Sequence, residues 1–213
     1  MSDLGLGSLT VEGFCEALAS DSPTPGGGAV GAIEAAAAAA LIAMVGRLTV
    51  DKPGFEDLAE RMRAMVVTAD AAQADFLDLA DRDAHAFDSV MVAFRMPKET
   101  DEDKATRSAA IQAGYLAAAS VPQEVARKAV DLMELAEDAT AMGNPQAASD
   151  GLSAAASLYA GALCAIANVE INASSLKDQD TRTTMLAELA SLKTRADQSL
   201  KESQTAFQLR LTP

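Results

Sequence analysis

Two long segments with almost no charge constrain the fold of this chain more than any other feature. The first runs from Ala29 to Gly46 and the second from about Gln146 to Leu176, and both are rich in alanine. Alanine has the highest helix propensity, and a helix that is apolar around most of its circumference needs neighbours on all sides. We therefore expect the two segments to form the centre of a helical bundle.

The rest of the chain also favours helices. β-branched and aromatic residues are sparse and alternate poorly, whereas apolar residues recur every three or four positions. The sequence predicts an all-α fold. Besides the two apolar segments, the expected helices cover residues 56–96, 100–119, 122–142 and 180–209.

Several of these boundaries rest on capping residues. Thr100 followed by Asp103 resembles a capping box that opens a helix. Pro122 is expected as the first residue of the next helix, because proline suits that position. Gly143 is expected to cap the end of that helix.

The length and composition indicate one domain covering residues 1–213. With 49% hydrophobic residues, the chain is long enough to bury a real core. A single chain of this size offers little surface to cover two helices that are apolar all round. We therefore expect a homodimer in which these helices are shared.

The charge balance excludes some partners. The chain has 17 basic and 31 acidic residues, a formal charge of −14 that repels nucleic acid and anionic lipid. We expect no membrane span, because alanine inserts weakly and Glu34 lies within the first apolar segment. The start of the chain lacks the features of a secretory signal. Cys15 and Cys164 are expected as small buried hydrophobes, which suits a cytoplasmic location.

The inventory of reactive residues points to carboxylates or lysines as catalysts. His85 is the only histidine, and the two cysteines are far apart in the sequence. Zinc-ligand spacings and Ser-His-Asp or Cys-His pairs cannot be assembled from this set. His85 lies outside the apolar register of its helix, so we expect it to be solvated or at an interface.

Asp83 falls on the apolar face of its predicted helix. The series Phe76, Ala80, Asp83, Phe87 and Val90 has steps of three and four residues. A carboxylate on such a face needs a partner or has a perturbed pKa. Asp83 is thus either a structural carboxylate that pairs with a lysine or caps a nearby helix, or a site residue.

Asp150 lies in the first turns of the second apolar helix. The positive end of the helix dipole favours its ionised form there, although aspartate is common at helix starts. Asn168 and Asn172 lie four apart on the same helix, about 27 Å along the axis from Asp150 at about 1.5 Å per residue. One helix therefore cannot bring all three to one ligand, and we expect the asparagines to bond across a helix interface.

The stretch PTPGGG, residues 23–28, leads directly into the first apolar helix. Its glycines either expose backbone N–H groups to an anion or serve only the turn and close packing. The scarce basic residues cluster near the helix starting at residue 100 and after the first apolar helix. These residues either hold a polyanionic substrate tail or are simply solvated.

Taken in order, these segments resemble a known family: the cyclodeaminase domain of formiminotransferase-cyclodeaminase and the stand-alone methenyltetrahydrofolate cyclohydrolase. The turn PTPGGGAVG with its alanine-rich helix is the most specific signature. The segments DAHAFDSVMVAFRMPKET, GNPQAASDGLSAA and NVEINASSLKD match further signatures in the same order. The resemblance covers nearly the whole chain.

The resemblance implies an all-helical homodimer that binds tetrahydrofolate carrying a one-carbon unit, with or without a polyglutamate tail. It implies no metal and no cofactor beyond the folate substrate. Two reactions are known in the family. In the deaminase, a folate nitrogen attacks the formimino carbon and ammonia leaves; in the cyclohydrolase, water opens the methenyl ring. The sequence does not separate them.

The resemblance also implies roles for the residues found above. Asp150 is expected to be the general acid-base, with Asp83 second and Lys52 orienting or protonating. The residues expected to contact the folate or its glutamate tail are Pro25, Gly26, Gly27, Gly28, Lys98 and Arg107.

The chain departs from the family pattern after the first apolar helix. Relatives carry two or three lysines followed by tyrosine there, whereas this chain reads DKPGF, with only Lys52 and with Phe55 in place of the tyrosine. Glu34 is also unusual within that helix. An alternative is therefore a non-catalytic helical dimerisation or ligand-binding module that keeps the scaffold.

Overall fold

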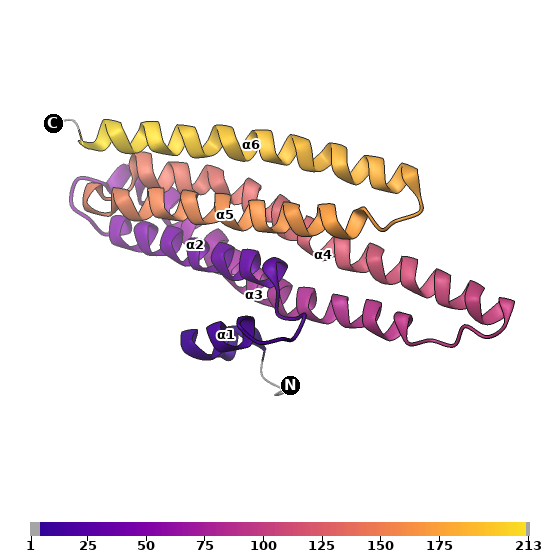
Figure 1. The fold of residues 1–213 in the computed structure, drawn as a ribbon. Helices are drawn as coiled ribbons and strands as arrows, with labels where there is room; N and C mark the ends of the chain where they lie inside the picture. The colour runs from indigo at the N-terminus through magenta and orange to yellow at the C-terminus, as the bar shows by residue number, and fades with distance from the viewer. Residues whose placement is uncertain (1–4, 212–213) are drawn as a thin grey trace.

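Six α-helices joined by short turns account for most of residues 5–211, the part of the chain that the computed structural model describes (Figure 1). The expectation of an all-α fold is confirmed. The helices are α1 (Val11–Leu18), α2 (Gly27–Val50), α3 (Ala59–Phe94), α4 (Asp101–Met142), α5 (Ala148–Ala173) and α6 (Gln179–Leu211). Three short 3₁₀ helices cover Leu6–Ser8, Glu56–Leu58 and Pro145–Ala147.

The two apolar helices lie side by side near the centre, as the sequence predicted. Helix α2 packs against α3 and α5, and α5 packs against α4 and α6 (Figure 1). The two run antiparallel. At the end where α2 finishes, the backbone N–H of Asn144 donates to the hydroxyl of Thr49 at 2.9 Å, which ties the start of the α5 segment to α2.

Helices α2 and α5 meet through a pair of glycines. A Cβ built on Gly31 would lie 2.7 Å from the carbonyl oxygen of Gly161, and one on Gly161 would lie 2.6 Å from that of Gly31. Both distances are shorter than any normal carbon–oxygen contact. The backbones can approach this closely only because neither residue has a side chain.

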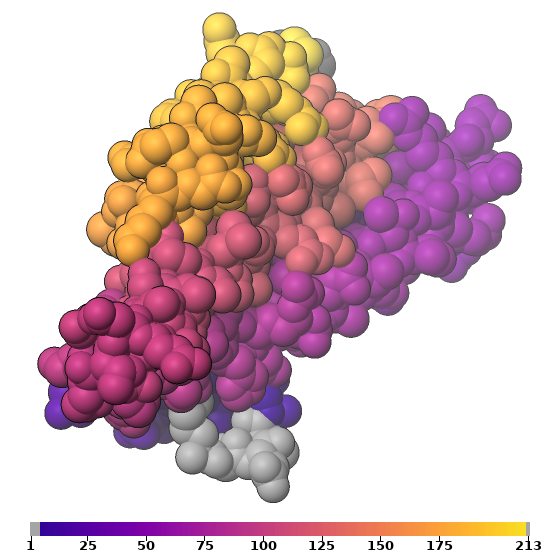
Figure 2. Space-filling model, turned by 90° about the vertical axis from the view of Figure 1, so that its right-hand side faces the viewer, coloured from indigo at the N-terminus to yellow at the C-terminus, as the bar shows by residue number. Residues whose placement is uncertain are grey.

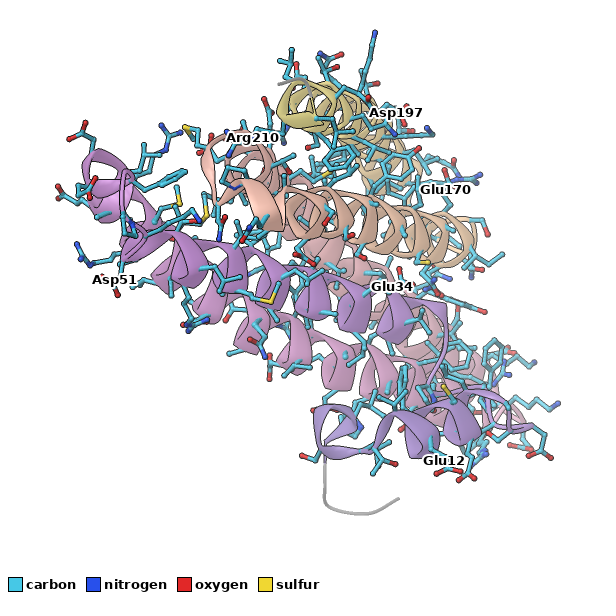
Figure 3. All side chains as sticks on the ribbon, turned by 90° about the vertical axis from the view of Figure 1, so that its left-hand side faces the viewer. Glu12, Glu34, Asp51, Glu170, Asp197 and Arg210 are labelled. Carbon is cyan, nitrogen blue, oxygen red and sulfur yellow. The ribbon has the colours of Figure 1, made fainter. Side chains whose placement is uncertain are left out.

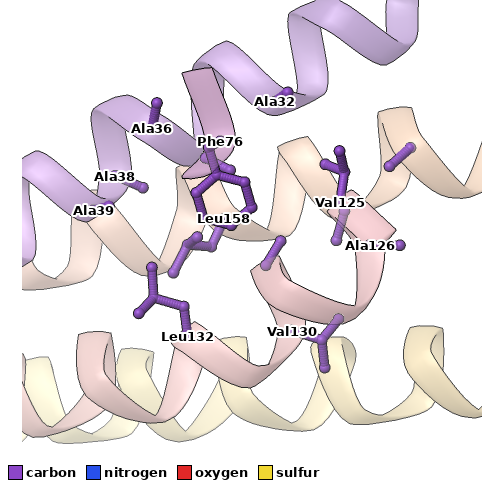
Figure 4. Close-up of a cluster of buried hydrophobic side chains, with 14 of the residues drawn as sticks. Ala32, Ala36, Ala38, Ala39, Phe76, Val125, Ala126, Val130, Leu132 and Leu158 are labelled. Carbon is purple, nitrogen blue, oxygen red and sulfur yellow. The ribbon is translucent and has the colours of Figure 1, made fainter. Parts of the chain in front are cut away.

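The core is built mainly from alanine against a few large side chains. Ala32, Ala38 and Ala39 of α2 are fully buried, and Phe76 of α3 and Leu158 of α5 are among the largest fully buried side chains (Figure 4). Small residues on the central helices leave space for these larger ones at native packing density.

The observed course of helix α4 differs from the prediction at Pro122. It continues through Pro122 as a single helix, so the prediction of a new helix starting there is wrong. Proline has no N–H and leaves the carbonyl four residues earlier without its helical donor. Here that carbonyl belongs to Ala118, and the side-chain amide of Asn172 on α5 donates to it at 3.0 Å. A neighbouring helix therefore supplies the hydrogen bond that proline cannot.

The other predicted caps agree better with the structure. Thr100 and Asp103 form the expected capping box, since each side chain bonds the other residue's backbone N–H. Gly143 is the C-cap of α4. Helix α6 packs along the outside of the bundle against α4 and α5, where Glu188 accepts hydrogen bonds from Arg127 and Gln123 of α4.

The N-terminal segment contains a short helix that the sequence analysis did not identify. Thr10 caps α1, and the backbone N–H of Leu6 donates to Asp81 of α3 at 2.6 Å. Cys15 is exposed on α1, so its expected burial is wrong. Cys164 is half-buried on α5.

No helix within residues 5–211 covers one side of the central helices α2 and α5 (Figure 1). Both α2 and the segment Pro145–Ala173 are long and apolar enough to cross a membrane, yet their most apolar stretches are 61% and 44% buried within the bundle. In Figure 1 these helices lie in front of α3 and α4. Their remaining exposed residues include Ala37, Ala156, Ala167 and Ile171. We call this surface the α2–α5 face.

Helices α3 and α4 extend past the other helices as a hairpin. Its tip, residues 95–100, lies apart from the rest of the bundle (Figure 1) and belongs to the magenta surface that faces the viewer in the space-filling view (Figure 2).

Candidate functional site

A cavity of about 350 Å³ opens where the start of α2 meets α3, α4 and the end of α5. Its lining combines an acidic side chain, two amides, an aromatic hydroxyl and bare glycine backbone. The lining residues are Pro23, Thr24, Gly26, Gly27, Asp83, Phe87, Tyr115, Ala118, Asn168, Ile171, Asn172 and Ser175.

Asp83 is the acidic group of this cavity. It is half-buried on α3. Burial raises the pKa of its carboxyl group to about 6, and a hydrogen bond from the backbone N–H of Ala29 partly opposes that rise. Ala29 is in the first turn of α2, so Asp83 caps this helix from outside. Asp83 therefore has the helix-capping contact that was one of the two expectations, and it also lines the cavity.

Glycines let α2 begin directly against these side chains. A Cβ on Gly28 would lie 2.6 Å from Cγ of Asp83, and a Cβ on Gly27 would lie 2.9 Å from the amide nitrogen of Asn168. The peptide bond between Thr24 and Pro25 is cis. The close approaches of Gly28 and Gly27 place the backbone of α2 against α3 on one side and α5 on the other.

Two asparagines of α5 form the opposite wall. The amide nitrogen of Asn168 donates to the carbonyl of Cys164 at 2.8 Å, and that of Asn172 donates to Asn168 at 2.9 Å and to Ala118 at 3.0 Å. The expected bond across a helix interface is confirmed for Asn172, whereas Asn168 bonds within its own helix.

A short chain of contacts connects the cavity with the α3–α4 hairpin. The ring of Tyr115 meets that of Phe94 edge-to-face, with centroids 6.2 Å apart. The guanidinium of Arg107 lies 5.6 Å from the centre of the Phe94 ring and donates to the Phe94 carbonyl at 3.2 Å. A basic group therefore stands just beyond the aromatic rim of the cavity.

The structure brings together only part of the predicted set. Asp83, Gly26 and Gly27 line the cavity, whereas Pro25 and Gly28 are buried behind the lining. Arg107 is not a lining residue; it contacts Phe94, whose ring contacts the lining residue Tyr115. Lys98 is exposed in the hairpin tip.

Asp150 and Lys52 lie at the other end of the central helices. Asp150 is half-buried in the first turn of α5, and Lys52 follows the last turn of α2, with its amine 6.0 Å from the ring centre of Phe55. The antiparallel packing puts both residues at the end opposite the cavity. A single subunit does not join them to Asp83.

Other predicted features have plain positions. His85 is exposed, with its imidazole 4.0 Å from Asp88, which confirms that it lies off the buried face of its helix. Among residues 5–211, no three His, Cys, Asp or Glu side chains are close enough to hold a metal ion.

A second groove, of about 470 Å³, lies between α4 and α6 near the C-terminus. Burial raises the pKa of Glu137 there, and neighbouring acidic groups add to the rise.

Sequence reasoning missed Tyr115, Ser175 and Thr24 as lining residues, and it assigned the asparagines only to packing. Tyr115 was detectable, because it is one of two tyrosines in the chain and sits within an alanine-rich stretch. Thr24 and Ser175 lie within the stretches PTPGGG and NVEINASSLKD, but no pattern singles them out from their neighbours there.

Comparisons with known proteins identify the family. The family model described as formiminotransferase-cyclodeaminase matches residues 10–191. A methenyltetrahydrofolate cyclohydrolase of Methylorubrum extorquens is 37% identical, over 87% of this chain and 89% of its own length. A formimidoyltransferase-cyclodeaminase of Sus scrofa is 36% identical over 84% of this chain, which spans only 33% of that relative.

A solved structure extends the likeness to the fold. The formiminotetrahydrofolate cyclodeaminase of Thermotoga maritima superposes with a TM-score of 0.85 at 32% identity, covering 95% of this chain and 98% of that one. The sequence match and the fold match thus both cover most of this chain and most of a relative of similar length. The chain belongs to the formiminotransferase-cyclodeaminase family.

Proposed function

We propose that the protein is a folate one-carbon enzyme that converts 5-formiminotetrahydrofolate to 5,10-methenyltetrahydrofolate with release of ammonia. The observation that carries this proposal is the position of Asp83, a carboxyl group with a pKa of about 6 in a cavity beside the glycine turn. Such a group exchanges protons readily near neutral pH.

Asp83 accounts for both proton movements of the reaction. The formimino group enters in its protonated, amidinium form, so attack of a folate nitrogen on its carbon leaves a neutral amino group there. The attacking nitrogen loses a proton, which the ionised carboxylate accepts. The carbon–nitrogen bond to the amino group then breaks, and the protonated carboxyl group returns the proton to the departing ammonia. The ring closes, and Asp83 is ionised again. Because these steps move only protons and a leaving group, the proposal requires no cofactor beyond the folate itself.

A second candidate is the hydrolysis of methenyltetrahydrofolate to 10-formyltetrahydrofolate. The cyclohydrolase of Methylorubrum extorquens favours it, since this chain covers 89% of that enzyme. In this reaction the carboxylate would accept a proton from the attacking water and return it to the ring nitrogen that leaves. The remaining hydroxyl proton is released to solvent as the formyl carbonyl forms.

The absorbance of the methenyl chromophore separates the two reactions. Formation of the chromophore from formiminotetrahydrofolate, with ammonia released in equal amount, supports the deaminase. Decay of added methenyltetrahydrofolate faster than its spontaneous rate supports the hydrolase. If the purified protein does neither, the non-catalytic alternative holds.

A pair of variants tests the role of Asp83. Asp83→Asn should lower turnover by about two to four orders of magnitude, the usual contribution of general acid-base catalysis. Asp88→Asn is the matched control, because Asp88 lies on the same helix but is exposed. Equal turnover in both variants would exclude Asp83 from the chemistry.

The expected homodimer is also part of the proposal, and the α2–α5 face supports it. The exposed residues of this face include Ala37, Ala156 and Ala167. Glu34 lies beside α5 (Figure 3) with its Oε2 atom buried and without a hydrogen-bond partner. Two such faces could pack closely. Sedimentation should show a dimer that Ala37→Glu weakens, whereas Ala190→Glu on the exposed side of α6 should leave it intact.

A dimer through this face offers a role for Asp150. A two-fold axis across the helices sets α5 antiparallel to its mate, so the first turn of α5 in one subunit can approach the last turns in the other. Asp150 and Lys52 of one subunit would then join the cavity of the other. Mixing Asp83→Asn with Asp150→Asn should restore up to about a quarter of the wild-type activity after random exchange of subunits. If no activity returns, Asp83 and Asp150 do not form a site that is shared between the two subunits.

A further inference from the structure

A chain of hydrogen bonds links Pro122 in the middle of α4 with the wall of the cavity. Because Pro122 lacks an N–H, the carbonyl of Ala118 accepts from the amide of Asn172 instead. The same amide nitrogen donates to the carbonyl of Asn168, and the amide of Asn168 donates to Cys164. Each asparagine amide is thereby held by backbone carbonyls.

These bonds fix which end of each amide is available. A carbonyl oxygen only accepts hydrogen bonds, so the atom facing it must be Nδ2 and not Oδ1. The Oδ1 atoms of Asn168 and Asn172 consequently remain free as acceptors, with no donor among residues 5–211. Both side chains line the cavity.

The cavity wall is therefore rich in acceptors and selects for N–H donors. We propose that Asn168 and Asn172 recognise the N–H donors of the reduced pterin ring, and that Pro122 is a positioning residue that holds Asn172 for this task. The proposal rests on the folate function argued above. The pyrimidine side of a reduced pterin carries an exocyclic amino group and ring N–H groups, whereas the glutamate tail carries mainly acceptors.

Pro122 matters because a helical N–H at this position would compete for the same carbonyl. With alanine at residue 122, the backbone N–H would bond Ala118 and draw its carbonyl toward the axis of α4. Asn172 would then keep only its bond to Asn168. Its amide would be less firmly oriented, although the helix itself would be better formed.

Binding of tetrahydrofolate without a one-carbon unit tests the recognition directly. By calorimetry, Asn172→Leu should weaken binding about tenfold, the value of one net hydrogen bond. Pro122→Ala should weaken it by a smaller factor, and in turnover assays it should raise KM with little change in kcat. Ser120→Ala is the control, since Ser120 is exposed and bonds a different carbonyl of α4, that of Leu116.

The ligand group that donates to Asn172 could instead be the formimino group. The same binding experiment distinguishes it from the pterin ring. If Asn172→Leu leaves binding of tetrahydrofolate unchanged but weakens binding of formiminotetrahydrofolate, the pterin assignment is overturned. If it weakens neither, the recognition role of Asn172 is overturned.

A melting experiment tests the link between Pro122 and Asn172 without any ligand. Asn172→Leu should lower the melting temperature by about 3 °C in the wild-type background, because the Ala118 carbonyl loses its donor. In the Pro122→Ala background the drop should be clearly smaller, because the restored N–H serves that carbonyl. Equal drops would overturn the positioning role.

The two measurements also separate this inference from the proposed function. If the wild-type protein binds no reduced folate, the function and the recognition role fail together, and the melting experiment still decides the hydrogen-bond link. If the wild type binds and turns over folate but the variants match it, only the inference fails.

Discussion

The carboxylate of Asp83 packs directly against the backbone of Gly28. The carboxylate of Asp83 lies where the side chain of any other residue at position 28 would stand, since a Cβ there would be 2.6 Å from Cγ of Asp83. The contact places an acidic side chain of α3 against the first turn of α2, where the backbone N–H of Ala29 donates to it. The cavity and the start of the central helix are therefore one piece of structure.

Gly28→Ala should consequently move Asp83 and lower turnover by about a hundredfold or more, as loss of a positioned acid-base group does. The helix itself should persist, because alanine favours helix. Steady-state kinetics and circular dichroism measure the two effects. Gly13→Ala in the exposed helix α1, where the added Cβ would meet only the Thr10 hydroxyl at 3.2 Å, is the control. Wild-type turnover of Gly28→Ala would contradict the close contact.

The activity should depend on pH through Asp83. The first step requires an ionised carboxylate, and its pKa is about 6. The value of kcat/KM should therefore fall about tenfold for each pH unit below 6 and level off above it. A rate profile measured from pH 4.5 to 8 checks this. A flat profile across pH 6 would assign proton acceptance to another group.

The same pKa shift also makes the stability depend on pH. Activity that depends on Asp83 rises with pH, whereas the contribution of Asp83 to stability falls with pH. The folded state binds the Asp83 proton more tightly than the unfolded state, whose carboxyl group titrates near 3.8. The favourable contribution is thus complete below that value and is lost as pH rises through about 6. Asp83→Asn resembles the protonated form, so its melting temperature relative to wild type should rise between pH 4 and pH 6. A constant difference would contradict the raised pKa.

Gly161→Ala should destabilise the protein by forcing α2 and α5 apart. The new methyl group would lie 2.6 Å from the carbonyl of Gly31, with backbone and not a flexible side chain in its way. Overpacking of this kind costs about 1–3 kcal/mol, which lowers the melting temperature of a chain of this size by about 2–4 °C per kcal/mol. Calorimetric melting measures it, and an unchanged midpoint would show that the helices separate freely.

Lys98 should matter for long glutamate tails and little for short ones. It is exposed at the hairpin tip, close in sequence to Phe94, which contacts Arg107 and Tyr115 at the rim of the cavity. Lys98→Ala should raise KM for a polyglutamylated folate more than for the monoglutamate, and added salt should narrow the gap. Lys201→Ala, at the groove near the C-terminus, is the control. Equal KM changes for both substrates would remove the tail from this surface.

Much of the fold could be predicted because helix signals are local. The two apolar helices, the capping box at Thr100 and the end of α4 at Gly143 follow from short-range patterns. Pro122 was misplaced for a long-range reason. The residue that makes its helix continuous, Asn172, lies on another helix and fifty positions away.

The site could be predicted only in part for a similar reason. Asp83 was found because a carboxylate interrupts an apolar series, and that signal survives in one sequence. The separation of Asp150 from Asp83 depends on the antiparallel packing of α2 and α5, which periodicity does not reveal. The free acceptors of the asparagines depend on which carbonyl each amide meets.

The cavity draws its walls from the turn before α2 and from three separate helices, α3, α4 and α5. A molecule bound there contacts segments that are far apart in the chain and holds them together. Occupancy and global unfolding are then thermodynamically linked, since each bound ligand must leave before the segments part. Resistance to heat or protease in the presence of candidate metabolites would therefore reveal the natural ligand without any assay of its chemistry.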